Sequence, residues 1–95
     1  EGPQVFVLSQ NYPNPFNPTT SIRISIPTES SVKLQIFDMT GALIRTVIDE
    51  ALNAGNMEVT WDGKNTVGSD VASGVYLYRV EAGKFISTKK MVLLR

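Results

Sequence analysis

Apolar and polar residues alternate along most of this chain, a pattern typical of β-strands with one buried face. In the segment Ser21–Ile26, three isoleucines occupy every second position and therefore fall on one face. Pro27 ends this run, because proline has no N–H to donate to a strand ladder. The segment Ser31–Ile36 repeats the alternation. Both segments are predicted to be strands.

A turn and a returning strand are predicted next. Asp38–Gly41 has the composition of a tight turn. Leu43–Ile48 is expected to return beside the preceding strand, although its alternation is irregular. Ile44 and Val47 can share one face only if a β-bulge lies between them. Ala51–Gly55 is expected to be a loop.

The second half of the chain predicts three more strands. Asn56–Trp61 alternates again, and Asp62–Gly74 is rich in Gly, Asn, Asp and Ser, which indicates a long turn region. Val75–Val80 is the strongest strand signal of the sequence. Glu81–Lys84 indicates a hairpin turn, after which the chain runs back from Phe85 to its end.

About six or seven short strands, with turns about every 8–12 residues, predict an all-β fold, an immunoglobulin-like antiparallel β-sandwich of about seven strands. Gly74, two residues before Tyr76, resembles the tyrosine corner of such sandwiches. The inward-facing positions predict a core made of Ile22, Ile24, Ile26, Val32, Leu34, Ile36, Ile44, Val47, Met57, Val59, Trp61, Tyr76, Tyr78, Val80, Met91 and Leu93.

The start of the chain has an unusual composition. Asn11–Pro18 contains three prolines in six positions, each of which fixes its own φ and extends the residue before it. Residues 1–19 are therefore expected to be a stiff strap ahead of a sandwich formed by residues 20–95. We predict that Tyr12 and Phe16 anchor this strap as a lid over one end of the sandwich. The alternative is a proline-rich docking peptide.

Composition excludes several classes of function. Nine basic and nine acidic residues cancel, so neither nucleic acid nor an anionic membrane surface is expected as a partner. The chain has no histidine and no cysteine, which excludes nucleophilic catalysis of the Ser-His or Cys type. No apolar run approaches the roughly 20 residues that span a bilayer. The first residues lack a signal peptide, so if the protein is exported, the export signal is expected upstream and these residues are expected to be a fragment.

The turn region after Trp61 carries the few candidates for chemistry. Asp62 and Asp70 could form a carboxylate pair, but a thin sandwich rarely offers the cleft that catalysis needs, so no enzyme and no cofactor are expected. Asp62, Asn65 and Asp70 could instead supply oxygen ligands to a calcium ion. We interpret these residues mainly as turn formers. Trp61 could stack on a sugar, but its strand position favours the core.

The last residues, Thr88–Arg95, place four apolar residues between charges at the end of the chain. On physical grounds they predict a final edge strand, with Lys89 and Lys90 as charges that discourage aggregation. Two adjacent lysines also suggest a bulge at this point. A terminal strand with unpaired backbone groups could also accept a partner strand.

Several motifs in a fixed order resemble one known family. They are Asn11–Thr20 followed by Ile22–Pro27, Val32–Asp38 with Gly41, Ala54–Gly55, Trp61–Gly63, Ala72–Arg79 and the ending Thr88–Arg95. Together they resemble the carboxy-terminal sorting domains of the type IX secretion system of the Bacteroidetes and related bacteria. The stretch Trp61–Arg79 also resembles the immunoglobulin-like domain of flagellar hook-capping proteins.

The resemblance implies a non-catalytic signal domain that directs an upstream cargo across the outer membrane, by way of the periplasm, to the cell surface or the medium. It implies the outer-membrane secretion machinery as partner and a surface sorting peptidase in many relatives. The implied recognition residues are Gly83, Lys89, Lys90, Met91, Val92, Leu93, Leu94 and Arg95. Two alternatives remain: an accessory module of a secreted hydrolase that binds polysaccharide or spaces domains, and a self-associating assembly module.

Overall fold

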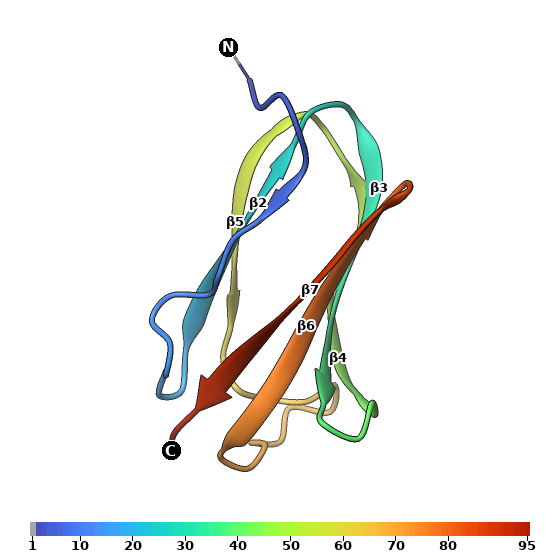
Figure 1. Ribbon diagram of the computed structural model, residues 1–95. Coiled ribbons are helices and arrows are strands. Elements are labelled where there is room, and N and C mark those ends of the chain that lie inside the picture. Colours follow the sequence, from blue (N-terminus) through green and yellow to red (C-terminus); the bar gives the residue numbers. More distant parts are fainter. Residues whose placement is uncertain (1) are drawn as a thin grey trace.

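The computed structural model describes residues 2–95 and forms seven β-strands in two antiparallel sheets that pack face to face (Figure 1). One sheet has the order β1-β2-β5 and the other the order β4-β3-β6-β7. No helix occurs in this described range, and hence none that could cross a membrane. The strands are β1 (Val7–Leu8), β2 (Thr20–Ile26), β3 (Ser30–Asp38), β4 (Leu43–Leu52), β5 (Gly55–Trp61), β6 (Gly74–Ala82) and β7 (Phe85–Leu93). The predicted antiparallel β-sandwich is confirmed.

The central strands of the two sheets supply most of the core. In β2 the three isoleucines are buried and the residues between them face outward. In β3 and β6 the burial alternates in the same way. This arrangement is expected because a central strand has neighbours on both sides, so its inward side chains are covered by the facing sheet and by both adjacent strands.

The edge strand β4 contains two bulges rather than the single one that the sequence suggests. Its register against β3 shifts between Leu34 and Gln35, and again between Ile36 and Phe37. Val47 and Ile44 lie at these shifts and are only half-buried, whereas Ile48 is buried. The prediction of a bulge is therefore confirmed, whereas Ile44 and Val47, which lie at the two shifts, pack against the core but are only partly buried.

The predicted core also differs from the structure in β5. Met57 and Val59 pack against the core but remain partly exposed, because β5 is an edge strand with a neighbour on one side only. Four residues of the core are absent from the predicted core, namely Leu8, Phe16, Ile48 and Ala82. Leu8 and Phe16 belong to the strap, whose path over the sandwich cannot be read from periodicity.

Two turns are tighter than the sequence suggests. β4 continues through Leu52 and β5 begins at Gly55, so the predicted loop Ala51–Gly55 shrinks to two residues. The turn between β6 and β7 also has only two residues, because Ala82 pairs with Phe85. Gly83 occupies this hairpin turn with φ +61°, a left-handed conformation that glycine adopts without a steric cost.

An aromatic cluster closes one end of the core. Trp61 is 1% exposed, its Nε1–H donates to the carbonyl of Lys64 at 2.9 Å, and its ring lies 5.6 Å from that of Tyr76. A sugar cannot stack on this buried ring, so the core prediction for Trp61 is confirmed. The hydroxyl of Tyr76 donates to the carbonyl of Ala72 at 2.6 Å, which is the bond of a tyrosine corner.

The strap joins the two sheets along one side of the sandwich (Figure 1). It contributes β1 to one sheet, and Tyr12 bridges to Ser21 in β2. Further on, Phe16 bridges to Leu93 in β7 of the other sheet. Through these contacts, residues 7–16 of the strap take part in both sheets.

The two aromatic residues of the strap have opposite environments. Phe16 is 2% exposed and its ring lies 5.8 Å from that of Trp61, so it anchors the strap as predicted. Tyr12 is 80% exposed, so the prediction that it packs against the core is wrong. The reason is register: Tyr12 pairs with Ser21, whose side chain points away from the core, and paired residues project to the same face.

Candidate functional site at the carboxy-terminal segment

The terminal recognition residues predicted from the sequence divide between the two faces of β7. Met91 and Leu93 face the core and are fully buried. Lys90 and Leu94 face outward and are exposed, and Val92 is half-buried on the same side. This division follows from the two-residue period of a strand. A partner that meets the folded domain can therefore touch the outward residues but not Met91 or Leu93.

The predicted bulge near the two lysines is absent. β7 pairs with β6 in continuous register from Phe85 to Leu93. No bulge is needed, because Phe85, Met91 and Leu93 are separated by even numbers of residues and already share one face. Lys89 lies on that inward face, at the partly open side of the sandwich, and is half-buried.

The terminal half of β7 is held by hydrogen bonds along both of its edges. On one edge lies β6, and on the other lies the strap. The N–H of Phe16 donates to the carbonyl of Val92, and the N–H of Leu94 donates to the carbonyl of Phe16, both at 2.9 Å. The N–H of Val92 donates to Oδ1 of Asn14 at 2.9 Å. The unpaired backbone groups expected at the terminus are therefore already occupied within the chain.

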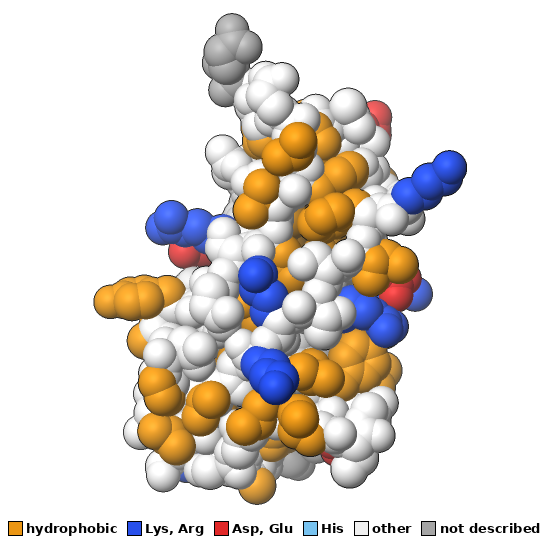
Figure 2. All heavy atoms as spheres, viewed as in Figure 1, with side chains coloured by type: hydrophobic (Ala, Val, Ile, Leu, Met, Phe, Trp, Pro, Cys, Tyr) orange, Lys and Arg blue, Asp and Glu red, His pale blue; other side chains and the backbone are white. Residues whose placement is uncertain are grey.

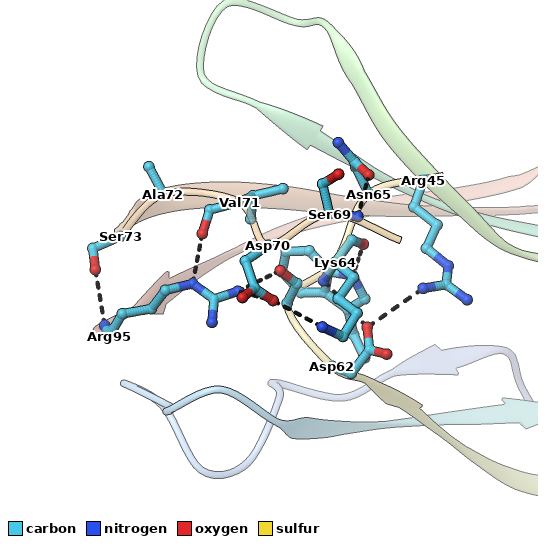
Figure 3. A network of polar contacts seen from close by, with 12 residues as sticks. Arg45, Asp62, Lys64, Asn65, Ser69, Asp70, Val71, Ala72, Ser73 and Arg95 are labelled. Carbon is cyan, nitrogen blue, oxygen red and sulfur yellow. Dashed lines mark hydrogen bonds and ion pairs between the residues drawn. The ribbon is translucent and has the colours of Figure 1, made fainter. Parts of the chain in front are cut away.

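Arg95 fixes the end of the segment to the turn region 62–74 (Figure 3). Its backbone N–H donates to the hydroxyl of Ser73 at 2.8 Å. Its Nε donates to the carbonyl of Val71 at 2.6 Å and its Nη2 to the carbonyl of Gly63 at 2.5 Å. Nη2 also lies 3.6 Å from a carboxylate oxygen of Asp70. The terminal residue is thus a cross-link between β7 and the longest loop.

Gly63 makes the approach of Arg95 possible. It has φ +74°, and a Cβ atom added to it would lie 2.7 Å from Nη2 of Arg95 and 3.1 Å from the carbonyl oxygen of Pro18. Only glycine combines this left-handed backbone with so little space. The turn-rich composition predicts a glycine turn here, but no sequence signal indicates that the last residue of the chain packs onto it.

Ion pairs support the same loop. Nζ of Lys64 lies 2.9 Å from Oδ1 of Asp70. The hydrogen bond from Lys64 and the positive charges of Lys64 and Arg95 hold the pKa of the Asp70 carboxyl below its usual value. Asp62 lies 3.4 Å from Nη1 of Arg45 in β4. The loop is thus connected to β4 at one end and to the chain terminus at the other (Figure 3).

The three residues considered as calcium ligands make internal contacts in this structure. Asp62 and Asp70 each face a basic side chain, and Oδ1 of Asn65 accepts hydrogen bonds from the backbone N–H groups of Val67 and Ser69. Among residues 2–95, no three acidic side chains gather closely enough to hold a metal ion. A turn-forming role is therefore sufficient to account for Asn65, and calcium binding at Asp62, Asn65 and Asp70 stays a prediction.

Gly83 does not lie with the other predicted recognition residues. It occupies the hairpin turn that precedes β7, whereas Arg95 follows the other end of the same nine-residue strand. At about 3.4 Å per residue the two positions are separated by most of the length of the molecule. The positive φ of Gly83 accounts for this residue by turn geometry alone.

The outward side of the terminal segment carries one basic and one apolar exposed side chain, those of Lys90 and Leu94. The described residues from Phe85 to Arg95 include Lys89, Lys90 and Arg95 but no acidic side chain. Figure 2 shows basic side chains that stand apart from acidic ones in the middle of this face, among polar and hydrophobic groups. Charged, polar and apolar groups thus lie together on this face of the molecule.

Comparison with solved structures finds the same fold in several proteins, among them PorU, PorZ and FlgD. Dimeric latent PorU from Porphyromonas gingivalis matches 95% of this chain with a TM-score of 0.72 and 23% identity. PorZ from the same organism matches 95% with a TM-score of 0.63 and 25% identity. FlgD from P. aeruginosa matches 78% with a TM-score of 0.61 and 23% identity. The search of curated protein sequences finds no match.

This chain corresponds to a small part of these proteins, since it spans 9% of PorU, 11% of PorZ and 57% of FlgD. Strands β2 to β6, the tyrosine corner and the glycine-containing turn after Trp61 all lie within residues 13–84, the range that matches the family model described as the FlgD Ig-like domain. On this match, which covers most of the chain, the protein belongs to the FlgD Ig-like domain family.

Proposed function

We propose that this chain is a non-catalytic carboxy-terminal sorting domain, which directs a secreted cargo protein across the outer membrane through the type IX secretion machinery. Its likeness to PorZ supports the proposal, because PorZ is an essential bacterial surface component of that secretion system. The cargo would lie upstream in the same protein. The domain would pass through the periplasm and meet outer-membrane machinery and, in some cases, a sorting peptidase at the surface.

The observation that carries the proposal is the construction of the terminal segment. The residues at a chain end are usually poorly ordered unless contacts tie them down. Here Val92 and Leu94 form hydrogen bonds with the strap, and Arg95 forms hydrogen bonds with the turn region. A segment held from three sides presents a constant shape to a partner, which lowers the entropy lost on binding. Such a surface suits a signal that the machinery reads on a folded domain.

Burial supports a smaller set of residues for the proposed signal than the sequence suggests. Met91 and Leu93 are structural, since they fill the core. The surface that remains for a partner consists of Lys90, Val92 and Leu94 together with the neighbouring strap. We therefore propose a composite surface rather than a linear peptide. Addition of a partner strand at the terminus would first require the strap to leave β7.

Deletion of Lys89–Arg95 is a poor test of this function. It would remove two fully buried core residues and half of an edge strand, so the domain itself would be expected to unfold. A loss of export could then reflect unfolding alone. Substitutions confined to outward side chains separate the signal from the fold.

The proposal is tested with a fusion protein that consists of an export signal, a reporter and residues 1–95, in that order. It is expressed in a bacterium that uses type IX secretion. We expect the reporter to reach the medium or the cell surface in the parent strain. In a strain without the outer-membrane translocation machinery it should accumulate in the periplasm. The proposal is wrong if the reporter leaves both strains equally or stays in the periplasm of both.

A further inference from the structure

The outward face of the β1-β2-β5 sheet is hollowed beside the strap. Two adjoining depressions of about 350 and 460 Å³ lie there and share Ser9, Arg23 and Glu58 as lining residues. Tyr12 borders the first depression, and Asn56 borders the second. Together they form one shallow groove across the sheet. The groove lies on the face that points away from the core and from the other sheet.

The groove results from a pattern of short and long side chains. Three serines of the strap and of β2, namely Ser9, Ser21 and Ser25, line the depressions with their small hydroxyls. Longer side chains, among them Arg23 and Glu58, rise around them. Backbone pairing fixes the layout, because the N–H of Ser9 donates to the carbonyl of Arg23 at 3.0 Å.

Tyr12 is the one large aromatic side chain at this groove, and it is 80% exposed. Its backbone is rigid: its N–H donates to the carbonyl of Ser21, and the N–H of Ser21 donates to its carbonyl, both at 2.9 Å. Pro13 follows directly. An exposed ring on a fixed backbone loses little conformational entropy when it binds a ligand.

The polar groups of the groove carry balanced charge. Nε of Arg23 lies 3.5 Å from a carboxylate oxygen of Glu58, so the cation and the anion offset each other. The hydroxyl of Ser25 donates to Oδ1 of Asn56 at 2.7 Å. Hydroxyl, amide, guanidinium and carboxylate groups can donate to and accept from many hydroxyls at once. No excess of either sign is present to select a phosphate or a carboxylate.

We propose that this groove binds a neutral polysaccharide. One sugar ring stacks with its C–H face on the ring of Tyr12, and the hydroxyls of the next sugar exchange hydrogen bonds with Arg23 and Glu58. A protein partner fits less well, because the groove lacks the apolar centre that protein interfaces use. The groove lies on the outward face of the other sheet from β7, and sugar binding is measured without export, so the two proposals are tested separately.

The test is a titration of the isotopically labelled chain, followed by NMR, with cellohexaose, xylohexaose and mannohexaose as separate probes. We expect at least one probe to shift the amide signals of Ser9, Tyr12 and Arg23. Tyr12→Ala should weaken that binding by about tenfold, the loss of one stacked ring, whereas Tyr12→Phe should bind almost as the parent does. Ile86→Ala, an exposed site on the other sheet, is the matched control and should bind normally.

Three results would overturn the inference. One is that no hexasaccharide shifts these signals at millimolar concentration. Another is that Tyr12→Ala binds the responding probe as tightly as the parent chain does. The third is a preference for an anionic probe such as an oligomer of alginate, which would show that Arg23 acts as a free cation. Because Tyr12 is exposed, its variants are expected to fold, which circular dichroism verifies.

Discussion

At the scale of single residues, Tyr78 connects the core to the strap. Its side chain is fully buried in β6. Its hydroxyl donates to the carbonyl of Ser9 at 2.7 Å and accepts from the N–H of Asn11 at 2.8 Å. Burial raises the pKa of Tyr78 to about 12, although the hydrogen bond from Asn11 acts in the opposite direction.

Tyr78→Phe should lower the free energy of unfolding by about 1–3 kcal/mol, because it leaves a buried N–H and a partly buried carbonyl without their partner. Urea denaturation followed by circular dichroism measures this change. The variant should also be less sensitive to alkali. A raised pKa means that the folded state holds its proton more tightly, so the stabilisation is complete below about pH 10 and is lost as the pH rises towards 12.

The free energies of unfolding of the parent and of Tyr78→Phe are compared between pH 9 and pH 12. Because all other titrating groups are common to both proteins, the difference reports the titration of Tyr78. Stability of the parent should fall more steeply than that of Tyr78→Phe. Equal slopes would show that this hydroxyl titrates at its ordinary pKa and that its two hydrogen bonds to the strap do not persist in solution.

Gly63 and Gly68 form a matched pair for testing the attachment of Arg95. Both have positive φ, +74° and +85°, but an added Cβ meets other atoms only at Gly63. Gly68→Ala should cost about 1–2 kcal/mol from backbone strain alone. Gly63→Ala should cost about 1–3 kcal/mol more, because Arg95 and Pro18 must shift.

Thermal and urea denaturation of the two variants measure the difference, and the NMR signal of the Arg95 Nε–H reports whether the side chain stays bound to Val71. We expect this signal to change in Gly63→Ala and to persist in Gly68→Ala. Equal destabilisation with an unchanged arginine signal would mean that the terminal residue is not packed on this turn.

Prediction of buried residues from the sequence succeeded on the central strands. It failed where the pairing register of a strand decides which residues face the core. The isoleucines of β2 are buried as expected, because a two-residue period leaves no other choice. In β4, two bulges make Ile48 the buried residue instead of Val47. The irregular alternation indicates that a bulge exists, but only the pairing with β3 shows where it lies. The prediction that Tyr12 packs against the core failed for the same reason, because its exposure follows from its pairing with Ser21.

At the scale of elements, the strap connects the two sheets, because it pairs with β2 in one sheet and with β7 in the other. Its buried polar residues are satisfied locally, since Nδ2 of Asn11 donates to the hydroxyl of Thr20, which donates to the carbonyl of Pro13. Composition predicted a stiff lid. It could not predict that the lid bonds to the last strand, because the contact of Phe16 with Leu93 joins distant parts of the sequence.

Phe16→Ala should lower the free energy of unfolding by about 3–5 kcal/mol, as expected for removal of a buried phenyl ring that packs on Trp61. Tyr12→Ala, four residues earlier in the same strap, should change it by no more than about 0.5 kcal/mol. Urea denaturation of both variants measures the contrast. A similar cost for the two substitutions would contradict the opposite environments of these rings.

At the scale of the whole molecule, the terminal surface is assembled from three separate regions of the chain. Residues 10–16, residues 63–73 and the last strand meet at one end of a body that measures 39 × 22 × 20 Å. The sequence indicated the sandwich and the importance of the terminus through family resemblance. The composite surface depends on contacts between regions that are far apart in sequence, which no local pattern encodes.

The central claim is that this folded terminal surface is the export signal. Its most direct test uses reporter fusions that carry Leu94→Asp or Lys90→Glu, with Val67→Asp as the control. Leu94 and Val67 are both exposed, at 53% and 84%, so each variant should remain folded, which circular dichroism of the purified domains verifies. The quantity measured is the ratio of extracellular to periplasmic reporter.

We predict that this ratio falls about tenfold or more for Leu94→Asp and for Lys90→Glu, as expected when one contact of roughly 1.4 kcal/mol or more is lost. Val67→Asp should export as the parent does. If Leu94→Asp and Lys90→Glu are folded and exported at the parental ratio, the terminal surface is not the signal.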